Sequence, residues 1–82
     1  MIALFMYNIC NQADEELFRK QCQALENRIP GLQAEELLED VDGTKIQRYR
    51  HHKGTVKVKN DVQVDAVYVE SDFELLAYFA KN

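Results

Sequence analysis

The alternation of apolar and polar positions along the chain predicts strands and helices in a mixed order. Residues 2–9 are apolar on both faces of an extended strand, apart from Asn8, and this is typical of a strand that is covered on both sides. We therefore expect this strand at the centre of a sheet. The next segment predicts an amphipathic helix that is capped by Asn11 and ends at Pro30-Gly31. Its apolar positions recur at helical spacing and are Leu17, Phe18, Cys22, Leu25 and Ile29.

Residues 32–41 fit two different structures. Their apolar positions fit a short helix, whereas Val41-Asp42-Gly43-Thr44 is a strong hairpin signal, because Asp-Gly readily adopts the positive φ angles of a type I′ turn. We favour the hairpin and keep the helix as the alternative. With a two-residue turn, positions whose numbers sum to 85 face each other, so that Asp40 opposes Lys45 and Glu35 opposes Arg50.

The downstream segments predict a β-meander and a last helix. The expected strands are residues 45–52, 55–59 and 62–69, joined by turns at Lys53-Gly54 and Asn60-Asp61. The strand over 62–69 is the most apolar after the first, so we expect these two strands to be neighbours. A helix over 73–80 is predicted by its wide apolar face and by Ser71 and Glu74, which have the spacing of a capping box.

These elements predict an α+β fold in which two helices pack on one face of a mainly antiparallel sheet of four or five strands. The order is strand, helix, three or four strands, helix, and the nearest common architecture is ferredoxin-like or a related split βαβ sandwich. Residues 1–82 form a single domain in this interpretation, because 46% hydrophobic and 29% charged residues give an ordinary globular balance. A core this small also favours a homodimer.

The apolar N-terminal run does not have the form of a signal peptide. No Lys or Arg precedes it, no small-residue cleavage pattern follows it, and it has about half of the roughly 20 residues that span a bilayer. We therefore expect a cytoplasmic protein that does not bind membranes. Cys10 and Cys22 lack the spacing of a zinc knuckle or a redox pair, and we expect two reduced, buried thiols.

Charged residues are segregated along the chain. Residues 35–42 carry five acidic and no basic residues, whereas residues 45–59 carry six basic and no acidic residues. Segments 1–34 and 61–82 have net charges of −1 and −4, which brings the formal total to −4. Opposite charges on adjacent strands stabilise a hairpin by roughly 0.2–1 kcal/mol per pair and fix its register. The two charge blocks are therefore either internal pairs or a binding surface.

We expect a small non-enzymatic interaction protein that binds another macromolecule, in the first place a protein, through these charged strand edges. The alternative is nucleic-acid binding by the basic hairpin 45–59, with cations on phosphates and Tyr49 as a stacking face. An isoelectric point near 5.0 counts against that alternative. The candidate binding residues are Glu35, Glu36, Glu39, Asp40, Arg48, Tyr49, Arg50, His51, His52, Lys53, Lys57 and Lys59.

No pattern in the sequence indicates catalysis. His51 and His52 would point to opposite faces of a strand, and we expect them to be solvated at a loop tip. The acidic run lacks the spacing of a calcium loop, and Asn8 cannot act as a base at the end of the first strand. We therefore expect no catalytic residue, metal ion or cofactor, and a hydrolase that uses clustered carboxylates is the third class left open.

Overall fold

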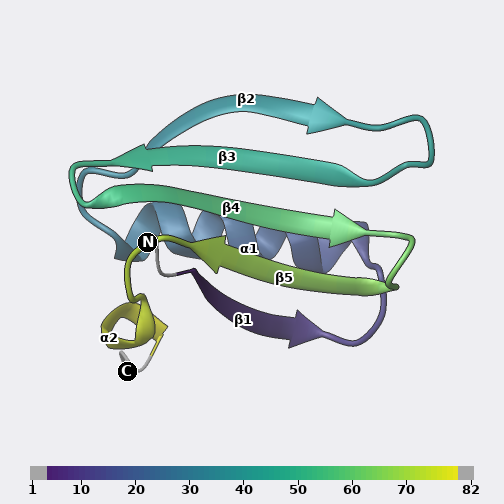
Figure 1. The fold of residues 1–82 in the computed structure, drawn as a ribbon, viewed down its shortest axis with the longest axis horizontal. Helices are drawn as coiled ribbons and strands as arrows, with labels where there is room; N and C mark the ends of the chain where they lie inside the picture. The colour runs from purple at the N-terminus through teal and green to yellow at the C-terminus, as the bar shows by residue number, and fades with distance from the viewer. Residues whose placement is uncertain (1–3, 80–82) are drawn as a thin grey trace.

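The computed structural model describes residues 4–79 as one antiparallel sheet with two helices (Figure 1). The strands follow the order β1-β5-β4-β3-β2 across the sheet, and all neighbours are antiparallel. The α+β fold with a five-stranded sheet is thereby confirmed, whereas a ferredoxin-like assignment is not confirmed by this strand order. The elements are β1 (Phe5–Cys10), α1 (Glu15–Arg28), β2 (Gln33–Glu39), β3 (Lys45–His51), β4 (Gly54–Asp61), β5 (Ala66–Ser71) and α2 (Leu76–Phe79).

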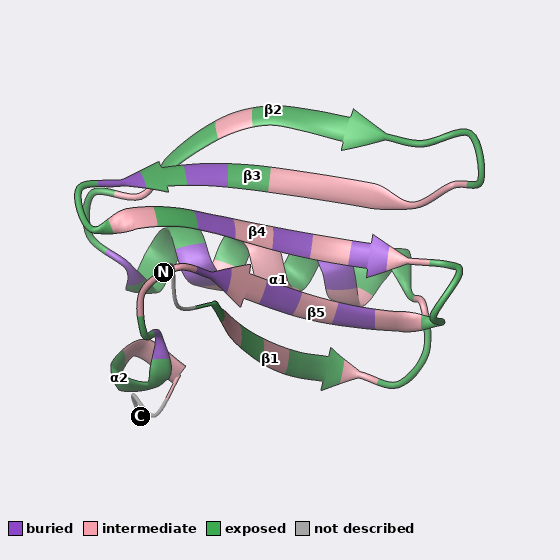
Figure 2. Cartoon of the chain, viewed as in Figure 1, coloured by how far each residue is buried: buried purple, intermediate pink, exposed green. Residues whose placement is uncertain are grey.

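The core lies between α1 and the central strands. The predicted stripe of α1 faces the sheet, with Phe18 and Leu25 buried on the helix and Ile29 buried just after it. Cys10 and Cys22 are free thiols that pack half-buried beside this core, and burial raises the pKa of the Cys22 thiol. Figure 2 shows that buried positions alternate with less buried ones along β4 and β5. This alternation means that only one face of the sheet is covered.

The first strand lies at an edge of the sheet, and the prediction of a central strand is wrong. Among the strands, β1 pairs only with β5, which confirms the expected neighbour. An apolar sequence did not indicate a covered strand here, because the side chains of Leu4 and Met6 are 59% and 60% exposed. The first two residues of the predicted strand lie outside the described part of the chain.

The β2–β3 hairpin is confirmed, but its turn is not of type I′. The Asp40 carbonyl accepts the Gly43 N–H at 3.1 Å, and the Asp40 N–H donates to the Thr44 carbonyl at 2.8 Å. Gly43 has a φ of 94°, whereas Asp42 keeps a negative φ. This is a three-residue loop closed by a left-handed glycine, and the Asp40 and Asp42 carboxylates stabilise it by accepting nearby backbone N–H groups.

The longer loop shifts the predicted register. Glu39, and not Asp40, opposes Lys45 across the hairpin, and Gln33, and not Glu35, opposes Arg50. A second irregularity between Ala34 and Leu37 adds to the shift. The cross-strand charge pairs that the two-residue turn implied are therefore not the register pairs of this hairpin.

Three further boundaries differ from the prediction because aspartate side chains make local hydrogen bonds. Asp14, not Asn11, is the N-cap of α1 and accepts the Leu17 N–H at 3.1 Å. The β4–β5 turn lies at residues 62–65, where the Asp61 carboxylate accepts two backbone N–H groups and Asp65 has a φ of 56°.

The last helix is shorter than predicted within the described residues. Ser71 is the final residue of β5, and its hydroxyl donates to the Phe73 carbonyl at 2.6 Å instead of capping a helix. α2 begins at Leu76, and the Leu75 N–H donates to the Tyr7 hydroxyl at 2.9 Å. This bond ties the segment that precedes α2 to β1, while the predicted helix end at Ala80 lies outside the described residues.

The candidate binding face

The face of the sheet that points away from α1, called the open face here, carries most of the predicted basic residues. Arg48 and Arg50 alternate with the buried Tyr49 along β3, and Lys57 and Lys59 alternate with the buried Val58 along β4. Neighbouring strands add side chains to the same face through the register. The open face comprises Met6, Asn8, Ile46, Arg48, Arg50, Thr55, Lys57, Lys59, Tyr68 and Glu70.

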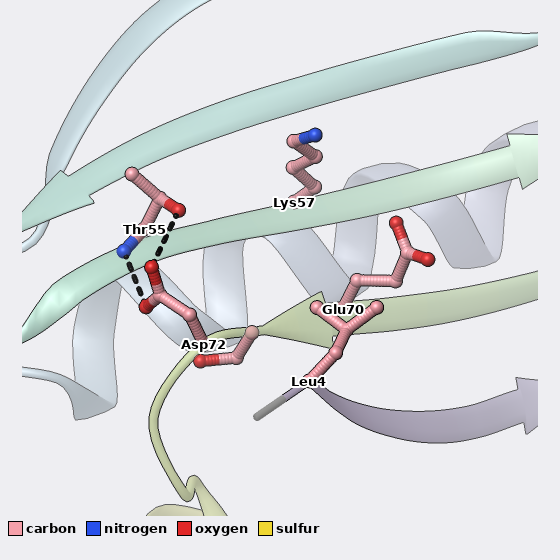
Figure 3. A pocket seen from close by; sticks show the side chains of 6 residues that line it. Leu4, Thr55, Lys57, Glu70 and Asp72 are labelled. Carbon is pink, nitrogen blue, oxygen red and sulfur yellow. Dashed lines mark hydrogen bonds between the residues drawn. The ribbon is translucent and has the colours of Figure 1, made fainter. Parts of the chain in front are cut away.

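Two cations lie directly opposite each other in the middle of this face. Arg48 on β3 is the register partner of Lys57 on β4. Like charges in such positions destabilise a sheet. Neither side chain forms an ion pair with any carboxylate in the part of the chain that the structure describes. Figure 3 shows the Lys57 side chain extending away from Glu70, so we call Arg48 and Lys57 the free cation pair.

The other two cations of the open face are neutralised. Lys59 binds Glu70 at 2.8 Å, and its ammonium lies 5.7 Å from the centre of the Tyr68 ring. Burial lowers the pKa of Lys59, but the hydrogen bond and charge of Glu70 outweigh it, so the pKa is raised. Arg50 binds Glu35 at 3.1 Å. The net positive charge of this face is therefore concentrated at the free cation pair.

A shallow hollow adjoins Lys57 on the open face. It measures about 370 Å³ and opens where the start of β1 meets the end of β5 (Figure 3). The Asp72 carboxylate on its wall is already used, since it accepts the Thr55 N–H at 2.8 Å and the Thr55 hydroxyl at 3.2 Å. Its lining residues are Leu4, Thr55, Lys57, Glu70, Ser71 and Asp72.

The sequence gave no signal for most of this hollow. Leu4 and Asp72 come together only because β1 pairs with β5, so that distant parts of the chain meet at one end of the sheet. Only Lys57 of its lining belonged to the predicted site residues. The pairing of the two most apolar strands was the available clue.

The predicted acidic residues lie along the free edge of β2. Glu35 is half-buried in its ion pair with Arg50, while Glu36, Glu39 and Asp40 are exposed. Lys45 does not bind Asp40 but reaches across to Glu15 of α1 at 2.8 Å, and this hydrogen bond lowers the pKa of Glu15. The acidic edge therefore borders the open face without neutralising the free cation pair.

Tyr49 faces the core and offers no surface for stacking. Its side chain is 0% exposed, and its hydroxyl donates to the Glu26 carboxylate at 2.7 Å. Burial and, to a smaller extent, the bond to Glu26 raise the pKa of the Tyr49 hydroxyl. The stacking role expected for this ring does not fit its position.

His51 is also buried, which corrects the expectation of two solvated histidines. Its Nε2 bonds the Pro30 carbonyl at 2.9 Å, and the Lys53 N–H donates to its Nδ1 at 3.2 Å. Its ring stacks on Phe73 with centroids 5.1 Å apart. His52 is exposed and lies against His51 at 4.2 Å, because it belongs to the turn and not to the strand. Lys53 is exposed in the same turn.

Within residues 4–79, no group of three or more His, Cys, Asp or Glu side chains is arranged to hold a metal ion. No helix in this described range is long and apolar enough to cross a membrane. Comparisons with protein-family models, with curated proteins and with solved structures find no match to the chain.

Proposed function

We propose that the protein is a non-catalytic interaction module whose open face binds an acidic segment of another protein. The observation that carries the proposal is the free cation pair, since Arg48 and Lys57 face each other without a carboxylate between them. A carboxylate bound between them would relieve their repulsion and form charge-assisted hydrogen bonds. The arrangement costs stability in the free protein and gains it in a complex.

The surroundings of the free cation pair favour a protein segment over a polyanion. Met6 is 60% exposed on the same face, and Ile46 beside Arg48 is half-buried. Such aliphatic neighbours, together with arginine, are typical of protein interfaces. The net charge of −4 repels a long polyanion, whereas a short acidic segment feels mainly charges within about 8 Å at physiological salt.

The acidic edge of β2 contributes to selectivity in this proposal. Glu36, Glu39 and Asp40 border the open face and carry no ion pair in the described structure. They repel an anionic ligand that runs past the free cation pair toward β2. The preferred ligand is therefore a short run of carboxylates flanked by apolar residues.

The test is fluorescence anisotropy with a labelled peptide that carries an Asp-Glu run between Leu and Phe residues. We expect Arg48→Gln combined with Lys57→Gln to weaken binding about tenfold or more, which corresponds to about 1.4 kcal/mol. The matched control is Arg19→Gln combined with Lys20→Gln, which removes the same charge from exposed positions on α1. Equal weakening by both double variants, or no binding by the unmodified protein, would contradict the proposal.

Single-stranded nucleic acid is the second candidate, because four basic side chains from two strands share the open face. The same variants test it with a labelled oligonucleotide. If this candidate holds, the free-cation-pair variant should reduce the slope of log affinity against log salt by about two units, one for each lost phosphate contact. Tighter binding of the oligonucleotide than of the peptide at equal salt would favour it.

A further inference from the structure

The two free edges of the sheet differ in charge. Residues 4–13, which include β1, carry no charged side chain, whereas β2 carries Glu35, Glu36 and Glu39. Edge strands present unpaired backbone N–H and C=O groups, and charged side chains are a usual protection against pairing with another chain. The β2 edge has this protection and the β1 edge does not.

The β1 edge is also apolar where it is most regular. Residues 5–8 pair with β5 in an unbroken register, and the irregularity of the strand comes only between Asn8 and Cys10. Leu4 and Met6 are 59% and 60% exposed along this stretch, and Ile9 is 36% exposed beyond it. An exposed apolar edge of this kind is a site of strand pairing.

A second apolar feature lies beside the same edge. A hollow of about 270 Å³ opens between α1 and the β1 side of the molecule, and Ile9 belongs to both the edge and the hollow. Leu17 and Ala24 of α1 and Phe79 of α2 give it an apolar lining, and Lys20 and Arg28 stand at its rim. A partner that pairs with β1 would therefore cover apolar surface on this side as well.

We propose that the occupant of the β1 edge is β1 of a second copy of this chain, paired antiparallel about a two-fold axis within residues 5–8. The two five-stranded sheets would then form one continuous sheet. Such an interface is isologous, so each copy supplies the same uncharged edge and the assembly closes as a dimer.

The other pairings of free edges are less favourable. Pairing β2 with β2 would set the carboxylates of Glu35, Glu36 and Glu39 against those of the second copy, and like charges opposite each other destabilise a sheet. Pairing β1 with β2 would be head-to-tail and leave a free edge at each end, so it would build an open filament. Only the β1–β1 pairing brings no carboxylate into the joint and also closes.

Area sets a requirement on this dimer. A stable interface buries about 800 Å² on each partner, which is about a seventh of the 5516 Å² that this chain exposes. Four residues of paired backbone do not supply that alone. The exposed side chains of Leu4, Met6 and Ile9 and the hollow beside α1 must take part. The inference does not rest on the proposed function, because the free cation pair lies on β3 and β4.

Sedimentation equilibrium of the full chain tests the dimer. We expect the unmodified protein to reach twice its chain mass of 9.6 kDa as its concentration rises. Met6→Lys should remain monomeric, because the dimer would bury two new ammonium groups at the joint. Met6 opposes Glu70 in the β1–β5 register, so the new charge meets a carboxylate and the monomer fold is retained. The matched control is Leu37→Lys on the β2 edge, at a residue that is 49% exposed, and it should still dimerise.

Hydrogen exchange of the unmodified chain gives a readout that does not depend on any variant. The backbone N–H groups of β1 that point away from β5 should exchange more slowly as the protein concentration rises, whereas those of β2 should not change. A chain that stays monomeric at high concentration overturns the proposal. So does a dimer that survives Met6→Lys but is lost in Leu37→Lys, or a protection that appears on β2 instead of β1.

Discussion

The face of the sheet that packs on α1 and the face that stays open treat their polar residues differently. On the covered face, Tyr49 bonds Glu26, His51 bonds Pro30, and Asn60 accepts the Asp14 N–H at 3.0 Å. No buried side-chain nitrogen or oxygen in the described residues lacks a hydrogen-bond partner. On the open face, the free cation pair has no carboxylate within ion-pairing distance. Polar groups serve the fold on one side, and their charge remains available for a ligand on the other.

Truncation of apolar side chains should separate the two faces most strongly. Leu25 is 1% exposed in the core, so Leu25→Ala should lower the free energy of unfolding by about 2–5 kcal/mol. Met6 is 60% exposed on the open face, so Met6→Ala should change it by no more than about 0.5 kcal/mol. Urea unfolding measures both values, and similar losses at the two sites would mean that the open face is covered in solution.

The pH dependence of stability should come more from the covered face than from the open one. The pKa of Tyr49 is raised in the folded protein, so the unfolded chain loses this proton first. The stability from Tyr49 is therefore complete below about pH 10, the ordinary tyrosine pKa, and falls as the pH rises above that value.

Tyr49→Phe should remove much of that loss, and at neutral pH it should cost about 0.5–1.5 kcal/mol for the hydrogen bond to Glu26. Tyr68→Phe is the matched variant on the open face, where the half-buried hydroxyl bonds Asp61 at 3.1 Å and burial also raises the pKa. We expect a smaller change in slope there, because Tyr68 is less buried. Unfolding by urea at about pH 8 and about pH 11 gives the slopes. An equal slope in all three proteins would contradict the role assigned to Tyr49.

The smallest expected effect has the opposite sign. Removing the free cation pair by Arg48→Gln and Lys57→Gln should raise the free energy of unfolding by a few tenths of a kcal/mol, because a repulsion between opposite residues disappears. Thermal unfolding at low salt, where repulsion is least screened, measures the change. A loss of stability would show that the two cations support the fold and would weaken the case for a binding role.

The sequence predicted the elements of this fold better than their boundaries. The stripe that contains Phe18 and Leu25 and the alternation of Val56 and Val58 follow from which side chains must be buried, and both are found in the structure. The turns depend on which backbone N–H an aspartate binds. Asp40 and Asp61 each had several local partners, and composition does not choose among them. The edge position of β1 depends on the whole sheet order, which no single segment encodes.

The candidate site was partly readable from the period of a strand. Residues 48–51 alternate between the two faces, so Arg48 and Arg50 could be separated from Tyr49 and His51 by period alone, although all four were grouped in one binding site. The opposition of Arg48 and Lys57 could not be found in this way. It depends on a two-residue turn at His52-Lys53, one position before the expected turn.

The strand order has a consequence for how the protein emerges from the ribosome. Strands β2 to β5 form a meander of neighbours in the chain, and each can pair as soon as the next has been synthesised. β1 is made first, yet its partner β5 ends only at Ser71, close to the last described residues. The most apolar strand therefore waits unpaired through almost the whole of translation. Its protection during that time depends on other components of the cell, and its pairing with β5 is expected to be a late step of folding.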